Sequence, residues 1–392
     1  MVIGHDLKDE LDNLYEDIKT GEYIYDTSEA IERFNFMEHC IRLTKSPYYG
    51  KQMQLMLWQK AWVEALYSFK MPDGSDRFWK TVLLVGRKNT KSELTSAIVN
   101  SELITGQPGS DIVCSSNDDN QAAIVYDAAD TMRRMYDPYD LDTKRNQRFI
   151  LNKITDSKVI KLSDRTHNKE GRNIDVAIID EIHEMTTNII AKSIEQSQSL
   201  KENPKCIEIS TEGFIRDGYL DKELKKCRAV INKEDDTIAG IRLLPWLYTQ
   251  DSESEVWKGD RDNRLWEKSN PTLGTIKRWD FLEMQVDMAR QSRADRAFTL
   301  TKDFNVKQNT VEAWLLPEYY TYPAKYDIRD FEGCFCLGGV DLSETTDLTA
   351  AKALIMLPED NTKYLISRYF IPETKLEETT EAPYKEWAED VS

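Results

Sequence analysis

Residues 80–92 read KTVLLVGRKNTKS and indicate the fold class of this chain. This segment opens with a short apolar run, 80–85, which predicts a buried strand, and it ends where a helical pattern begins at Ser92. A strand, a basic turn and a helix in this order form the context of a phosphate-binding loop. In such a loop, backbone N–H groups and the start of the helix surround phosphate groups.

The residues of this loop have distinct expected roles. We expect Lys91 to reach the β- and γ-phosphates of a nucleotide and the Ser92 hydroxyl to bind Mg²⁺. The match to G-x-x-x-x-G-K-[ST] is imperfect, since Val85 and Thr90 stand at the two glycine positions. A basic surface turn is therefore the alternative for this segment taken alone. The phosphates are expected to contact the other loop residues: Gly86, Arg87, Lys88, Asn89 and Thr90.

Further short apolar runs follow, with helical stretches between them. The runs lie at 111–115, 176–179 and 206–210, and the helical stretches include 92–104 and 119–135. Strands that alternate with helices predict an α/β fold with a mainly parallel sheet and helices on both faces.

The run 176–179 ends in two carboxylates, Asp180 and Glu181. A P-loop ATPase needs one carboxylate to hold Mg²⁺ and another to orient the attacking water. The carboxyl end of a parallel strand is also where α/β sheets bind ligands. We therefore expect Asp180 to hold the metal and Glu181 to position water, with an acidic helix cap as the structural alternative. His183 and Glu184 follow in an order that departs from the H-E-x-x-H zinc motif, so no zinc site is predicted.

The overall charge is strongly acidic but unevenly distributed. The formal net charge is −17, which by itself argues against DNA binding because phosphate contacts need Lys and Arg. Residues 1–50 hold 5 basic and 11 acidic side chains, whereas residues 51–100 hold 8 basic and 4 acidic ones. A local basic face can therefore still meet phosphate.

The sequence also indicates the cellular compartment in which the protein is expected. The chain lacks an apolar run of about 18 residues and starts with polar, acidic residues, so neither a membrane span nor a signal peptide is expected. A cytoplasmic protein is the default expectation. None of the six cysteines shows zinc-site spacing, and Cys334 and Cys336, two apart on an expected strand, are predicted to be buried thiols.

Three segments in the expected order point to a family. RKNTKS (87–92), AIIDEIHEM (177–185) and ISTEG (209–213) together resemble the large terminase subunits of tailed phages, the HK97-like branch in particular. That family packages DNA into procapsids with an ATPase domain followed by a nuclease domain. The resemblance implies ATP and Mg²⁺ as cofactors, double-stranded DNA as the substrate, and the cytoplasm of the host cell as the location. It also implies three partners: the terminase small subunit, the portal protein, and further copies of the chain in a ring.

The resemblance assigns roles to further residues. Trp58 and Gln59 stand where the family carries its adenine-recognition element, although a Trp is more often a core residue. Arg87 stands where terminases carry an Arg inside the phosphate loop. Ser210 and Thr211 resemble the motif that couples nucleotide state to movement, with a helix cap as the alternative.

The segment GGVDLS, 338–343, resembles the opening of the terminase nuclease domain, which has an RNase H-like fold. That chemistry uses carboxylates that hold two Mg²⁺ or Mn²⁺ ions. Asp341 would bind the nuclease metals and Asp347 is a second candidate, whereas a polar turn is the alternative without the upstream motifs. The acids at 377, 378, 381 and 386 are interpreted as a solvated face. Because the family's nuclease domain is longer, we expect this one to be truncated and inactive.

These observations predict four parts. They are a helical segment at 1–45, a P-loop ATPase domain at 46–250, a connector at 251–330, and the start of an RNase H-like nuclease domain at 331–392. An arginine finger is expected between ring neighbours, with Arg165 and Arg172 as candidates. Two alternatives remain. One is another P-loop nucleic-acid ATPase such as a helicase. The other is a non-catalytic assembly protein, which Thr90 and the acidic charge favour.

Overall fold

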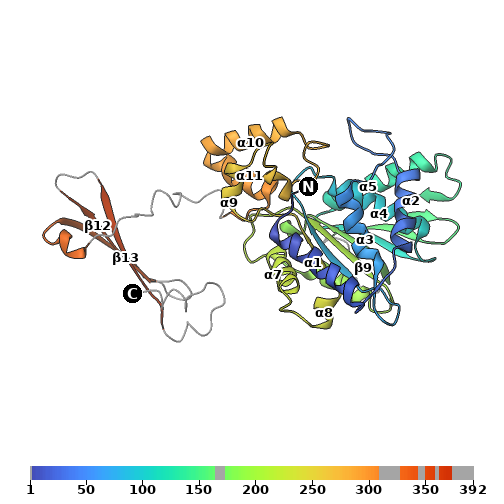
Figure 1. Ribbon diagram of the computed structural model, residues 1–392, viewed down its shortest axis with the longest axis horizontal. Helices are drawn as coiled ribbons and strands as arrows, with labels where there is room; N and C mark the ends of the chain where they lie inside the picture. Colours follow the sequence, from blue (N-terminus) through green and yellow to red (C-terminus); the bar gives the residue numbers. More distant parts are fainter. Residues whose placement is uncertain (1, 164–172, 309–326, 343–348, 358–361, 373–392) are drawn as a thin grey trace. The chain divides into compact units, whose positions relative to one another are not determined.

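The computed structural model describes residues 2–163, 173–308, 327–342, 349–357 and 362–372. The chain divides into two compact units, Met1–Ala313 and Trp314–Ser392, which we describe separately (Figure 1). Within the described residues, no helix combines the length and the apolar character needed to cross a bilayer.

An eight-stranded sheet forms the centre of the first unit. Its strand order is β10-β3-β9-β8-β4-β7-β6-β5. The six strands from β10 to β7 pair in parallel, and β6 and β5 continue the sheet in antiparallel pairing. The prediction of a mainly parallel sheet is thus confirmed. The strands are β3 (Lys80–Leu84), β4 (Asp111–Ser116), β5 (Thr143–Arg145), β6 (Phe149–Asn152), β7 (Lys158–Ser163), β8 (Ile174–Asp180), β9 (Lys205–Ser210) and β10 (Leu243–Leu247).

Helices cover both faces of this sheet, as the alternating pattern predicts. The helices are α1 (His5–Thr20), α2 (Ser28–Cys40), α3 (Leu57–Ser68), α4 (Lys91–Thr105), α5 (Asp119–Tyr136), α6 (Ile189–Ser197), α7 (Tyr219–Ile231), α8 (Ile238–Ile241), α9 (Glu253–Lys258), α10 (Trp279–Gln291) and α11 (Arg293–Phe304). Short 3₁₀ turns lie at Ile182–Glu184 and Leu265–Lys268, and a two-stranded ribbon joins β1 (Ile24–Tyr25) to β2 (Phe69–Lys70).

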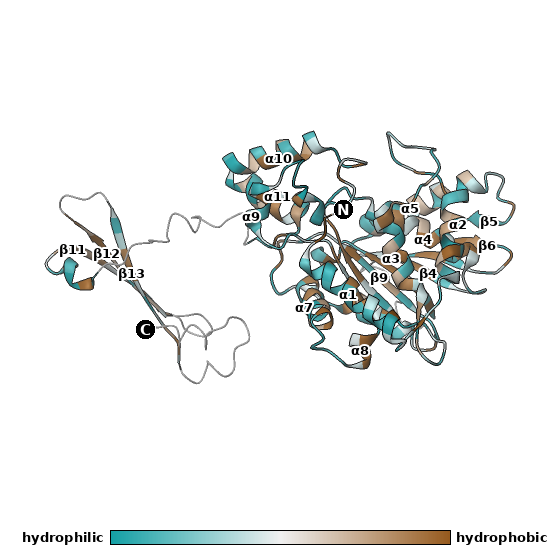
Figure 2. Ribbon diagram, viewed as in Figure 1, coloured by the Kyte–Doolittle hydropathy of each residue, from teal (hydrophilic) through white to brown (hydrophobic). Residues whose placement is uncertain are grey.

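The continuous apolar strands separate two cores. Side chains of a strand alternate between the faces of a sheet, so each strand supplies both. On β3, Leu83 belongs to the core beneath α2 to α5, whereas Val82 and Leu84 belong to the core beneath α6 and α7. Figure 2 shows these strands as apolar and the outer helix faces as polar. Burial on both faces explains why the strands lack polar alternation.

A third, smaller core lies under α9 to α11 and includes Trp266, Leu282 and Phe304. The stretch from Trp279 to Phe304 forms two helices, α10 and α11. Its break lies at Ser292, whose extended backbone ends α10 and whose hydroxyl accepts a hydrogen bond from the N–H of Asp295 at the start of α11. A serine in this position is a typical N-cap.

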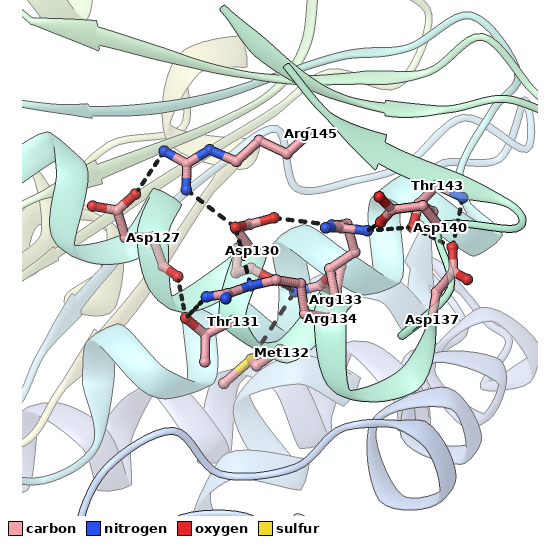
Figure 3. Close-up of polar contacts among 12 residues, drawn as sticks. Asp127, Asp130, Thr131, Met132, Arg133, Arg134, Asp137, Asp140, Thr143 and Arg145 are labelled. Carbon is pink, nitrogen blue, oxygen red and sulfur yellow. Dashed lines mark hydrogen bonds and ion pairs between the residues drawn. The ribbon is translucent and has the colours of Figure 1, made fainter. Parts of the chain in front are cut away.

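A polar network fixes the far edge of the sheet to α5 (Figure 3). The buried guanidinium of Arg133 donates to Asp130 at 2.9 Å and to Asp140 at 2.6 Å. The carboxylate of Asp137 accepts the backbone N–H of Thr143 at 2.7 Å, which places the first residue of β5. Arg145 then pairs with Asp130 at 3.1 Å. Because charged groups are buried only when paired, these contacts hold the antiparallel edge strands against the helix.

The second unit contains a three-stranded antiparallel sheet. Its strands are β11 (Phe335–Asp341), β12 (Thr349–Met356) and β13 (Lys363–Phe370), preceded by a 3₁₀ turn at Ile328–Phe331. The prediction of two buried thiols is wrong. Cys334 is half-buried and precedes β11, and Cys336 is exposed, because both faces of β11 are open in the described residues.

Candidate nucleotide-binding site

Three loops meet at the carboxyl edge of the parallel sheet. They follow β3, β9 and β8, which are neighbours in the sheet. Since parallel strands end at the same edge, loop 85–92, the segment from Asp180 to Met185 and the segment 210–213 lie side by side. The sequence-predicted residues Lys91, Ser92, Asp180, Glu181 and Ser210 all belong to these loops.

The turn after β3 has the expected strand–loop–helix form. Lys88 and Thr90 adopt left-handed backbone conformations with φ of 65° and 64°. The ammonium of Lys91 is buried and donates to the carbonyl of Val85 at 3.1 Å, so its side chain folds back over the loop. Arg87 is exposed, and its guanidinium lies 5.6 Å from the ring centre of Phe298.

Thr90 occupies a position where the sequence motif has glycine, and the structure accommodates it. Its hydroxyl accepts a hydrogen bond from the amide of Gln59 at 3.1 Å, which ties α3 to the loop. The neighbouring Trp58 points into the core, where it is 1% exposed and makes an edge contact with Tyr248. Of the predicted adenine-recognition pair, Gln59 therefore reaches the loop, and Trp58 is a packed core residue.

The start of α4 meets the end of β8. The hydroxyl of Ser92 lies 3.1 Å from Oδ2 of Asp180. Oδ1 of Asp180 accepts the N–H of Glu181, and its backbone carbonyl accepts the hydroxyl of Ser116. A hydroxyl and a carboxylate are the oxygen donors that Mg²⁺ prefers, so this pair fits a magnesium ion.

Burial and mutual contact perturb the charges at this point. Burial lowers the pKa of Lys91, although Glu181 and Asp180 act in the opposite direction. Burial and the charge of Glu181 raise the pKa of Asp180. Burial acts to raise the pKa of Glu181 as well, but contact with His183 and the charge of Lys91 outweigh it, and that pKa lies below its usual range. Two adjacent carboxyls with pKa values pushed apart are typical of functional sites.

A second set of contacts on the loop comes from residues far along the chain. The carbonyls of Ser269 and Asp303 approach Gly86 so closely that a Cβ there would lie 2.8 Å and 2.5 Å from them. Gly86 is thus needed for this close approach. The N–H of Gly86 donates to Ser269 and that of Arg87 to the carbonyl of Lys302.

Buried polar side chains complete this support. The amide of Asn89 donates to Gly86 at 2.8 Å and to Asn270 at 3.0 Å. Lys277, also buried, donates to the carbonyl of Arg87 at 3.1 Å and to Asp303 at 2.6 Å. Asn270, Lys277, Lys302 and Asp303 lie in a segment that carries no motif, so the sequence offers no signal for their role.

The remaining predicted residues lie at the end of β9, in the second unit or outside the described residues. Ser210 ends β9 and Thr211 follows it; both are buried beside the loop, and the N–H of Val85 donates to the carbonyl of Ser210. Asp341 ends β11 in the second unit and is exposed. Outside the described residues lie Asp347, Arg165, Arg172 and the acids at 377, 378, 381 and 386.

Comparisons with known proteins agree with this geometry. Residues 57–229 match a family model described as the terminase large subunit, ATPase domain. Residues 244–390 match a second one, described as the terminase large subunit, endonuclease domain. The two matches follow one another in the order that the resemblance implies.

Individual relatives are distant. The terminase large subunit of Lactococcus phage p2 is 23% identical over 344 residues, which cover 84% of this chain and 61% of that protein. The protein YmfN of Escherichia coli K12 is 24% identical over 213 residues, which cover 52% of this chain and 44% of that protein. This chain thus spans about three fifths of the length of the phage relative.

Among solved structures, the large terminase of bacteriophage HK97 shares the fold. It superposes with a TM-score of 0.61 at 21% identity and covers 92% of this chain and 72% of that one. Two domain matches in order, across most of the sequence, are consistent with this shared fold. This chain belongs to the terminase large subunit family and contains its ATPase and endonuclease domains.

Proposed function

We propose that this chain hydrolyses ATP at the carboxyl edge of its parallel sheet. The observation that carries the proposal is the contact of Ser92 with Asp180 at 3.1 Å, next to the buried Lys91 and the carboxylate of Glu181. These are the parts that ATP hydrolysis requires: a cation for the phosphates, oxygen ligands for the metal, and an acceptor for the attacking water.

In this proposal some residues bind the nucleotide and its metal ion, and others act in the hydrolysis step. In the proposed complex Lys91 leaves the carbonyl of Val85 and binds the β- and γ-phosphates. The N–H groups of 88–91 bind the phosphate oxygens, and Gln59 supports the loop through Thr90. Ser92 and Asp180 hold Mg²⁺, which when bound neutralises phosphate charge. Glu181 orients a water for attack on the γ-phosphorus.

We further propose that hydrolysis drives the translocation of double-stranded DNA into a procapsid. The support is membership of the terminase large subunit family. Translocation remains a proposal because this chain spans only part of the length of its phage relative, whereas the motor activity belongs to the whole protein. The proposed partners are the terminase small subunit, the portal protein and further copies of this chain in a ring. The proposed place of action is the cytoplasm of the host cell, and Ser210 and Thr211 are the proposed coupling residues.

For the second unit, we propose that Asp341 binds the metal ions of an RNase H-like nuclease, together with Asp347. The support is the position of Asp341 at the end of β11, the first strand of an antiparallel sheet. The proposed metals are Mg²⁺ or Mn²⁺. We also propose four parts for the chain. They are the helical segment 1–45, the ATPase domain 46–250, a connector 251–330 and the start of the nuclease domain at 331–392.

The test is a steady-state ATPase assay with and without double-stranded DNA. We expect hydrolysis by the wild-type chain and its loss in Lys91→Ala, with DNA raising the wild-type rate. ATP with Mg²⁺ should also raise the melting temperature of the wild type and leave that of Lys91→Ala unchanged. A folded wild-type chain that binds no ATP would instead favour the non-catalytic assembly protein. Nucleotide-driven strand separation would favour a helicase.

A further inference from the structure

His183 lies between the ends of two neighbouring strands. Its Nδ1 atom is 3.0 Å from Oε2 of Glu181, which follows β8. The same nitrogen is 3.1 Å from the hydroxyl of Ser210, the last residue of β9. The imidazole is 9% exposed. One ring atom thus contacts both the proposed water-orienting acid and the proposed coupling serine.

The hydrogen-bond network assigns the proton of this ring. The hydroxyl of Ser210 has one proton, and it points to the carbonyl of Thr211 at 2.8 Å. Its oxygen therefore accepts, both from the backbone N–H of His183 at 3.1 Å and from the ring. The other neighbour of Nδ1 is a carboxylate, which only accepts when ionised. This arrangement favours the tautomer with the proton on Nδ1, since a bare lone pair there would face two acceptors.

Tight packing fixes the position of the ring. A Cβ at Gly213 would lie 2.8 Å from the Cβ of His183, so the backbone after β9 presses directly against the histidine. That backbone is itself held by α11 and the residue after it. The N–H of Glu212 donates to Asn305 at 2.9 Å, and Lys302 donates to the carbonyl of Glu212 at 3.0 Å.

The acid needs such support. Glu181 adopts a left-handed backbone conformation with φ of 54°, which is strained for a residue with a Cβ. Its Oε2 atom is buried and has no hydrogen-bond partner among the described residues, and the nearest cationic or donor group is Nδ1 of His183 at 3.0 Å. An electrostatic contact from Nδ1–H therefore orients the carboxylate and leaves its lone pairs available to a water molecule.

We propose that His183 is a positioning residue for ATP hydrolysis. Its Nδ1–H holds the carboxylate of Glu181 in the orientation that directs water, and Ser210 sets the ring. The inference rests on the proposed role of Glu181 in ATP hydrolysis. His183 gives up no proton in this role and touches neither nucleotide nor metal. A shift of Ser210 would move the ring and hence Glu181, which gives the end of β9 a direct route to the hydrolysis step.

The first test compares three substitutions in the full chain. The amide of His183→Asn can place an N–H where Nδ1 lies, whereas the amide of His183→Gln extends to the position of Nε2. We expect His183→Ala and His183→Gln to lower the single-turnover hydrolysis rate by about 10- to 100-fold, the range for a catalytic group displaced by about 1 Å. ATP affinity should stay within about 2-fold, and His183→Asn should recover most of the rate.

A purely structural role would give a different result. In that case the melting temperature and the ATP affinity would fall together with the rate, and Asn would rescue no better than Gln. Either outcome would overturn the inference. Ser210→Ala combined with His183→Ala should also be no slower than His183→Ala alone, because both act on Glu181 through one contact.

A second test is independent of hydrolysis. The chain has four histidines, so side-chain nitrogen NMR after ¹⁵N-histidine labelling can resolve them, with His183→Asn to assign the signal. We expect the Nδ1–H tautomer in the wild type and a shift toward Nε2–H in Ser210→Ala. A wild-type Nε2–H tautomer would disprove the contact even if ATP is hydrolysed. A wild type that has the Nδ1–H tautomer but hydrolyses no ATP would contradict the proposed function and, with it, the positioning role.

Discussion

The hydroxyl of Ser92 lies 3.1 Å from a carboxylate oxygen of Asp180, although 88 positions separate the two residues. Ser92 stands in the first turn of α4 and Asp180 ends β8, with β9 between β8 and β3 in the sheet. The parallel topology creates the contact, because β3 and β8 end at the same edge. Two residues of opposite halves of the site are thereby placed where a single metal ion can reach both.

Replacement of Glu181 should separate binding from turnover. An amide cannot accept a proton or orient water as a carboxylate does, so Glu181→Gln should lower the hydrolysis rate by about 10²- to 10⁴-fold. Because the effect is on the transition state, ATP affinity should change by less than about 3-fold. Single-turnover kinetics and equilibrium nucleotide binding measure the two quantities. Glu184→Gln is the matched control, and an equal loss in that variant would point to a general charge effect.

Lys277→Met should weaken the phosphate loop from a distance. The change leaves the buried carboxylate of Asp303 without its 2.6 Å partner and frees the carbonyl of Arg87. Loss of one partner of a buried ion pair typically costs about 3–5 kcal/mol of stability. We expect a fall of that order in the free energy of unfolding by urea, together with weaker ATP binding. Adding Asp303→Leu should restore much of the stability, and failure to do so would mean that the pair is not the cause.

Stability should depend on pH through Glu10 on α1. Burial raises the pKa of Glu10 to about 8 against the opposing charge of Arg77, compared with an ordinary value of 4.5. The folded state then keeps a proton that the unfolded state releases, so stability falls as the pH rises from about 4.5 to about 8. Glu10→Gln should remove this fall and be more stable than the wild type at pH 8 by about 1–3 kcal/mol. Urea unfolding at pH 5 and pH 8 tests this, and parallel curves would refute it.

The isolated chain should be a slow ATPase and mainly a monomer. An arginine finger supplied by a neighbouring subunit can contribute 10³–10⁵ in rate in related NTPases. The net charge of −17 also opposes self-association at low salt. Light scattering together with the specific ATPase rate at rising protein concentration measures both. A monomer with fast turnover would contradict a finger supplied in trans.

The chain should not cleave DNA on its own. Two-metal hydrolysis needs several converging carboxylates. Asp341 is the recognised candidate within the described part of the second unit, where it is exposed. Supercoiled plasmid incubated with the protein and Mn²⁺ or Mg²⁺ should remain intact. Cleavage that disappears in Asp341→Ala would show instead that the nuclease site is complete.

Much of the ATPase half could be predicted from the sequence because its signals are local. Each of its main features can be recognised within a window of about ten residues. These features are the apolar run of β3, the loop that ends in Lys91 and Ser92, and the acids at the end of β8. Two periodicities, strand and helix, then limit the topology to a mainly parallel sheet. That topology brings Ser92 and Asp180 to one edge, so the core of the candidate site follows from local pattern and sheet geometry together.

The residues that support this core are brought to it by tertiary packing. Asn270, Lys277 and Asp303 reach the phosphate loop across more than 180 positions of chain, and single polar residues in a region without a motif carry no periodic signal. The same holds for His183, whose role depends on Ser210 lying 3.1 Å away on the next strand. Periodicity reports which face of an element is buried. It does not report which polar side chains come into contact once faces from distant segments pack together. In this protein, such contacts between distant polar side chains hold the phosphate loop and the acid Glu181 in place.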